Sequence, residues 1–235
     1  MNKYFSTFIS GFQEIVEREL SRSLPGLEIA ILSDGLVVYK TSASIKEVQK
    51  VRFLNNSFIL LSRSNSSSHQ NPETTVSTLL RNADFSGASE TSKLGFVKYF
   101  RVMISKENQT IPISQNVLDQ VEKTISLRFR LKIHRTLPDI EFWFFIRSDG
   151  LSLFGARITP LGKMKVRKYE KGELRQELVN FMILMSDPEK EDVVLEPFSG
   201  SGAIIMERVN NHPYKKVYAG DIDRQKVDDL ERKTK

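Results

Sequence analysis

The strongest constraint on the fold is a short apolar run that leads directly into a turn with two glycines. Residues 193–195 are all apolar, as in strands that are buried on both faces of a parallel sheet. The turn contains Gly200 and Gly202, and a helical pattern follows it. The pattern predicts a helix over 173–185, a strand over 193–195, a helix over 203–209, a strand over 217–219 and a helix over 224–235. This alternation predicts the first part of a doubly wound α/β sheet.

The preceding residues show strand and helix patterns in two stretches. The first predicts a helix over 12–20, strands over 27–32 and 36–39, a helix over 45–53 and a strand over 58–61. The second predicts a strand over 99–104, a helix over 117–129 and a hairpin over 141–158. Between them, the Ser- and Asn-rich tract 62–75 predicts a loop. Both stretches therefore read as small α+β units.

These patterns divide the chain into four parts. The Thr-Pro-Leu-Gly sequence at 159–162 breaks the strand pattern, and lysines and arginines crowd the residues that follow it. We expect a first unit over 1–62, a second over 63–158, a basic linker over 159–172 and the α/β part over 173–235.

The composition excludes several kinds of site. The 235 residues contain no cysteine, which excludes disulfides, iron–sulfur clusters and cysteine nucleophiles. Only 3 histidines are present, so no metal site is expected. No stretch approaches the roughly 20 apolar residues of a membrane-spanning helix, so we expect no membrane partner and a cytoplasmic location. The net charge of +6 fits a polyanionic partner.

The glycine turn is the best candidate for a ligand site. In an open α/β sheet, ligands bind outside the carboxyl ends of the strands, where glycines let them approach the backbone. About twenty residues further on, the next strand ends at Asp221, whose carboxylate can accept hydrogen bonds from ribose hydroxyls. The pair indicates a nucleoside-bearing cofactor, although a Gly-Ser turn that only joins strand to helix is the alternative.

Elimination favours one cofactor. Ile205 stands where a dinucleotide fingerprint needs its third glycine, and no G-x-x-x-x-G-K-[ST] phosphate loop is present. S-adenosylmethionine suits a loop that starts with an acid and makes no provision for phosphates. We expect the bend at the end of the first strand to surround its methionine part, Asp221 to hold its ribose and Ile222 to flank its adenine. The residues of this bend are Glu196, Pro197, Phe198, Ser199, Gly200, Ser201 and Gly202.

The same residues resemble a known family. Together with Ala203 and the earlier segment 171–175, the bend resembles the cofactor motif of THUMP-containing, S-adenosylmethionine-dependent RNA methyltransferases that modify guanine N2 in tRNA or rRNA. The usual motif is Asp-Pro-Phe-Cys-Gly-Ser-Gly-Thr, from which Glu196, Ser199 and Ala203 depart while keeping charge or small volume. Residues 137–157 are similar to the closing hairpin of a THUMP domain, and the region before the THUMP part is similar to a ferredoxin-like domain.

The resemblance implies both a fold and a function. The fold would combine α+β and α/β parts: a ferredoxin-like domain and a THUMP RNA-binding domain, followed by the first part of a Rossmann-like methyltransferase domain. The family's later Asp/Asn-Pro-Pro-Tyr/Phe loop, which holds the substrate base, is absent from this sequence, and the single proline of 211–214 belongs to a turn. We therefore expect the chain to be truncated and inactive alone, with a partner or a missing C-terminal segment completing it. Catalysis in the complete enzyme would rest on proximity, so no catalytic residue is named.

Two basic clusters are candidates for RNA contacts. One follows the long helix and includes Arg130, Lys132 and Arg135. The other lies in the linker and includes Lys163, Lys165, Arg167 and Lys168. Phosphate contacts from such residues would provide affinity with little sequence choice, whereas a solvated surface is the plainer interpretation.

The aromatic run 142–145 favours a core strand over a base-stacking platform. Alternate side chains face opposite ways, so Phe142 and Phe144 are expected in the core, and Trp143 and Phe145 against the other face. His69 and His212 are expected at the surface. The alternative function is an RNA-recognition module that neither binds a cofactor nor catalyses a reaction.

Overall fold

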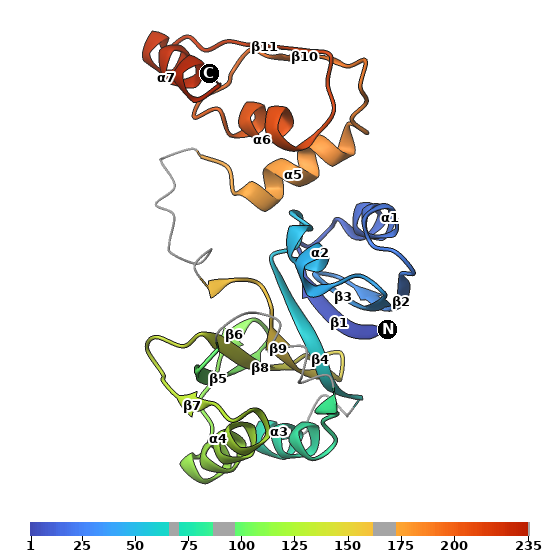
Figure 1. Cartoon of the computed structure of the whole chain (residues 1–235), viewed down its shortest axis with the longest axis vertical. Coiled ribbons are helices and arrows are strands. Elements are labelled where there is room, and N and C mark those ends of the chain that lie inside the picture. The colour runs from blue at the N-terminus through green and yellow to red at the C-terminus, as the bar shows by residue number, and fades with distance from the viewer. Residues whose placement is uncertain (66–70, 87–96, 162–172, 235) are drawn as a thin grey trace.

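The computed structural model describes residues 1–65, 71–86, 97–161 and 173–234. In these residues the chain forms a nine-stranded sheet with helices, followed by a smaller part with a two-stranded parallel sheet. The two parts lie one above the other in Figure 1, and helix α5 (Gln176–Met185) faces the amino-terminal helices. Within the described residues, no helix is long and apolar enough to cross a membrane.

The large sheet runs continuously through the front of the chain. Its order is β2-β3-β1-β4-β9-β8-β5-β6, with β7 also paired to β5. The strands are β1 (Asn2–Thr7), β2 (Glu28–Ser33), β3 (Leu36–Thr41), β4 (Asn56–Asn65), β5 (Tyr99–Lys106), β6 (Gln109–Thr110), β7 (Lys132–Ile133), β8 (Ile140–Ile146) and β9 (Leu151–Arg157). Antiparallel pairing of β4 with β9 joins the two stretches, so the expected boundary between residues 62 and 63 falls inside β4.

Four helices accompany this sheet. They are α1 (Gln13–Ser23), α2 (Ile45–Lys50), α3 (Pro72–Arg81) and α4 (Gln115–Phe129). Their apolar side chains join one core with alternate residues of the strands, including the fully buried Phe142 and Phe144. Trp143 and Phe145 pack with Phe58 in a second cluster on the other face, so the prediction for the aromatic strand is confirmed.

The prediction of a loop over 62–75 is wrong at both of its ends. Strand β4 continues to Asn65, and the Ser62 hydroxyl donates to the carbonyl of Leu79 across 2.7 Å, which satisfies a polar side chain inside the core. Helix α3 begins at Pro72, where Asn71 accepts a hydrogen bond from the Glu73 amide. Asn followed by Pro is a strong helix start, which the polar composition of the tract concealed.

The smaller part has the predicted order of elements. Helix α5 is followed by β10 (Val193–Glu196), α6 (Ala203–Asn211), β11 (Lys216–Ala219) and α7 (Arg224–Thr234). Helix α5 starts three residues later than predicted, because Arg175 has the extended backbone of a cap residue.

One expectation about the strand β10 is wrong. Val193 and Leu195 are 61% and 71% exposed, whereas burial on both faces was predicted. They alternate with the half-buried Val194, so they project from one face of the two-stranded sheet. That face also carries Tyr218, which lies opposite Leu195 and is 48% exposed. An uncovered apolar face therefore remains on the described part of the chain.

Candidate cofactor site

The glycine bend and Asp221 lie at the same edge of the parallel sheet. Strands β10 and β11 pair with Glu196 opposite Ala219, so their carboxyl ends coincide. The amide of Gly200 donates to Asp221 Oδ2 across 2.8 Å, and the amide of Ser199 donates to the carbonyl of Gly220 across 2.8 Å. The sequence-predicted acid thus contacts the sequence-predicted bend directly.

Both glycines of the bend have left-handed backbone conformations. Gly200 has φ +52°, and the nearest atom to a Cβ there would be the Phe198 carbonyl oxygen at 3.9 Å, so the space beside it is open. Gly202 has φ +81°, caps helix α6, and has no room for a Cβ because Leu230 Cδ1 would lie 2.5 Å away. The bend therefore presents bare backbone beside Gly200 and packs tightly at Gly202.

Asp221 is held as an anion. The amides of Asp223 and Gly200 donate to its carboxylate and keep the pKa of Asp221 below its ordinary value. A carboxylate has about four acceptor positions, and these two bonds leave room for further donors such as ribose hydroxyls. Asp221 is therefore suited both to fix the bend and to accept bonds from a ligand.

The remaining bend residues differ in exposure. Phe198 is 84% exposed and Ile222 is fully exposed, so apolar surface borders the bend. Ser199 is buried, and in the described part of the chain its hydroxyl has no hydrogen-bond partner. The Glu196 carboxylate accepts from the Phe198 amide across 3.2 Å, while Pro197 is exposed and Ser201 is half-buried.

This arrangement fits S-adenosylmethionine. A nucleoside needs a carboxylate for its ribose, apolar surface for its base and backbone that it can approach, and Asp221, Ile222 and Gly200 supply these features. Within the described residues, the unpartnered hydroxyl of Ser199 adds a buried polar group for a ligand atom.

A buried polar cluster ties the helix after the bend to the front of the chain. Glu207 of α6 is 5% exposed and accepts two hydrogen bonds from Arg52, across 2.7 and 2.6 Å. Asn180 of α5 also donates to it, across 2.9 Å. His212 was expected at the surface, but it is half-buried with its Nε2 3.0 Å from the Asn180 amide nitrogen, so that expectation is wrong.

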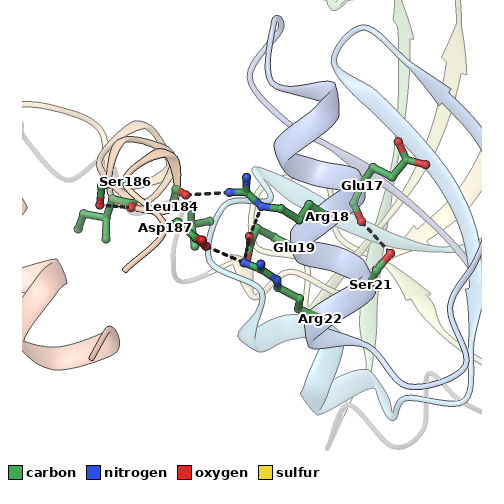
Figure 2. Close-up of polar contacts among 9 residues, drawn as sticks. Glu17, Arg18, Glu19, Ser21, Arg22, Leu184, Ser186 and Asp187 are labelled. Atoms are coloured by element: carbon green, nitrogen blue, oxygen red, sulfur yellow. Dashed lines mark hydrogen bonds and ion pairs between the residues drawn. The ribbon is translucent and has the colours of Figure 1, made fainter. Parts of the chain in front are cut away.

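Helix α5 carries the rest of this contact. The buried ring of Phe181 stacks on Phe12, with centroids 4.3 Å apart. Figure 2 shows Arg18 of α1 donating to the carbonyl of Leu184 and Arg22 reaching the carboxylate of Asp187, at 2.8 and 3.0 Å. The front of the chain is therefore packed directly against the helices of the candidate cofactor part.

Replacing Arg52 by alanine is expected to lower the free energy of unfolding by about 1–3 kcal/mol. Removing one partner of a fully buried ion pair costs about 3–5 kcal/mol, and the one-third exposure of Arg52 reduces this. Urea unfolding at pH 7 measures the decrease, with the exposed pair residue Lys215→Ala as a control.

The same variant should show a characteristic pH dependence. Burial acts to raise the pKa of Glu207, but the bonds and charge of Arg52 outweigh it and hold the pKa below the ordinary 4.5. The stability from this pair is thus present above pH 4.5 and lost as the pH falls through the lowered pKa. The difference from wild type should therefore shrink in acid, and a difference that persists undiminished would show that the charge is not its cause.

The predicted RNA-contact residues fall into two groups. Arg130 ends helix α4 with a left-handed backbone, Lys132 lies in β7, and both are exposed. Arg135 is also exposed but bonds to the buried Glu122 across 3.1 Å, which commits part of its charge. Lys163, Lys165, Arg167 and Lys168 lie outside the described residues.

A glycine bend at a strand end, bonded to an acid from the next strand, defines a nucleoside-binding α/β domain. Residues 165–230 match the family model UPF0020, described as an RMKL-like methyltransferase domain. The chain is 26% identical over 131 residues to a tRNA (guanine(6)-N2)-methyltransferase of Thermus thermophilus. That match covers 54% of this chain and 39% of the enzyme, so it spans less than half of the relative's length.

Solved structures show the same fold. TrmN from Thermus thermophilus superposes with a TM-score of 0.74 at 20% identity, over 99% of this chain and 69% of that one. SMU.472, a putative methyltransferase complexed with SAH, gives 0.57 at 17% identity, over 99% and 63%. These likenesses confirm the mixed α/β and α+β fold class, and the matched C-terminal segment has the sequence pattern of a methyltransferase domain.

Proposed function

We propose that this chain provides the RNA-binding front and the cofactor-binding bend of an S-adenosylmethionine-dependent methyltransferase that acts on guanine N2 of tRNA or rRNA. The hydrogen bond from the Gly200 amide to Asp221 carries the proposal, because it joins open backbone to an ionised acid at the edge of the sheet. The match to a tRNA (guanine(6)-N2)-methyltransferase supports the reaction class and the RNA substrate.

Each bend residue has a distinct task in this proposal. When bound, the cofactor supplies a methyl group on a cationic sulfur, which a guanine amine can accept. Asp221 accepts hydrogen bonds from the ribose, and the exposed Ile222 packs on the adenine. Glu196 and the backbone from Pro197 to Gly202 surround the methionine part. The chain's contribution is binding and orientation, and no side chain needs to act as a nucleophile.

Binding of the substrate base is a separate requirement. The sequence contains no Asp/Asn-Pro-Pro-Tyr/Phe loop, and the face with Val193, Leu195 and Tyr218 is uncovered in the described residues. We therefore propose that a further segment or a partner covers this face and supplies the base contacts. A methyl-transfer assay with labelled cofactor and tRNA should give no turnover from this polypeptide alone, and robust turnover would contradict this part.

RNA binding should depend steeply on salt through the linker cluster. Replacing Lys165, Arg167 and Lys168 by glutamine removes up to three phosphate contacts, so we expect the slope of log affinity against log salt to flatten by about 0.7–0.9 for each phosphate that is no longer bound. Filter binding of tRNA at several salt concentrations measures this slope. A control triple of equal charge comes from the exposed Lys190, Lys215 and Lys216. An unchanged slope in the linker variant would remove the cluster from the interface.

A further inference from the structure

A second cavity opens at the other face of the large sheet, away from the glycine bend. It encloses about 320 Å³, near the lower end of the range for small-ligand pockets. Its walls come from the β2–β3 and β5–β6 turns and from the segment before β4, and its floor contains Phe58, Trp143 and Phe145. Residues from both front stretches of the chain thus meet around one hollow.

The floor of this cavity is aromatic and partly open. The rings of Trp143 and Phe145 are stacked, with centroids 5.3 Å apart and planes 20° apart, and both are only half-buried. The indole nitrogen of Trp143 donates to the buried carboxylate of Glu141, which fixes the ring. Fixed, half-open aromatic rings bind planar ligands by stacking.

The charged groups of the walls are already committed to protein partners. Arg147 bonds to Asp149, Asp34 accepts from the Gly11 amide and from Gln13, and Glu107 accepts from the Ser148 amide. The cavity therefore has little free charge for a phosphate or a cation. A neutral ring with a hydrogen-bonding edge suits it better.

Two asparagines provide that hydrogen-bonding capacity. Asn55 and Asn108 line the cavity, and among the described residues neither side-chain amide has a hydrogen-bond partner. An amide presents a donor and an acceptor together, which matches the edge of a nucleobase. Single-stranded RNA is recognised in this way, by stacking on aromatic rings and hydrogen bonds to base edges.

We propose that this cavity binds an unpaired nucleobase of the RNA, stacked on Trp143 and Phe145 and hydrogen-bonded by Asn55 and Asn108. The proposal rests on the RNA-binding part of the proposed function. The same sheet face offers charge for the adjoining phosphates: Lys3 lies opposite Lys40 in the β1–β3 pair, and Arg63 lies opposite the buried Leu153 of the same cluster. A strand of RNA should therefore bind more tightly than a mononucleotide.

Tryptophan fluorescence tests the proposal directly, because Trp143 is the only tryptophan in the chain. The full chain is titrated with each of the four nucleoside monophosphates, with a single-stranded hexanucleotide RNA and with a blunt RNA duplex. We expect saturable quenching by the single strand, weaker quenching by a mononucleotide, and none by the duplex or by ribose 5-phosphate. Quenching by mononucleotides with equal affinity would overturn the RNA assignment in favour of a free nucleotide.

The variants separate this cavity from other RNA contacts. Asn55→Ala with Asn108→Ala should weaken the single strand about tenfold, whereas Asn210→Ala, which removes an exposed asparagine on α6, should not. Circular dichroism checks that each variant is folded. If tRNA still binds in the filter assay but the single strand gives no saturable quenching, or the double variant binds it unchanged, the cavity proposal is wrong and the proposed function stands. If neither assay detects RNA, both fail.

Discussion

Alanine at Gly155 is expected to lower the free energy of unfolding by about 3 kcal/mol, the upper end of the range for overpacked cores. Gly155 lies in β9, where a Cβ would stand 2.5 Å from the backbone oxygen of Ile59 and 2.5 Å from the ring of Phe5. The carbonyl cannot move without disturbing the β4–β9 pairing. The cost therefore falls on the strand pair that joins the two front stretches.

Urea unfolding followed by Trp143 fluorescence and circular dichroism measures this cost. Gly220→Ala is a matched control, because its Cβ would lie 3.8 Å from the nearest atom, the Pro197 carbonyl oxygen, which is ordinary contact. A change below about 0.5 kcal/mol for Gly155→Ala would show that Phe5 and β4 adjust freely, against the tight continuous sheet described above.

The front of the chain was predictable where its patterns are local. The helix over 12–20 and the hairpin over 141–158 follow from apolar spacing and a turn signal, and the structure has α1, β8 and β9 there. Strand β1 was not predicted, because a six-residue run at the terminus has little pattern of its own. Its pairing with both β3 and β4 comes from the tertiary fold, which a local reading of the sequence does not contain.

The candidate site divides in the same way. Gly200, Gly202 and Asp221 were found because glycine spacing after a strand and an acid about twenty residues later form a short-range signal. The partnership of Arg52 with Glu207 joins residues 155 positions apart. An arginine after a short helix and a glutamate inside another carry no mark of their pairing, so only the packed structure reveals that the front of the chain supports helix α6.

Loss of the Asp221 carboxylate should have the largest effect on the cofactor. Asp221→Ala removes the acceptor proposed for the ribose hydroxyls and also the bond that holds the Gly200 amide. We expect S-adenosylmethionine affinity to fall at least about 30-fold, since hydrogen bonds to charged groups are the stronger ones and the substitution removes more than one of them. Asp221→Asn keeps one acceptor oxygen and should give an intermediate effect. Asp228→Asn, an exposed residue of α7, is the control.

Isothermal titration calorimetry of S-adenosylmethionine into the folded full chain tests most directly whether the bend at 196–202 holds a methyl donor. We predict one binding event per chain for the unaltered protein and for Asp228→Asn, and a strongly weakened one for Asp221→Ala. No heat of binding with the folded protein, or equal affinity in the unaltered protein and Asp221→Ala, would contradict the assignment of this bend as a cofactor site.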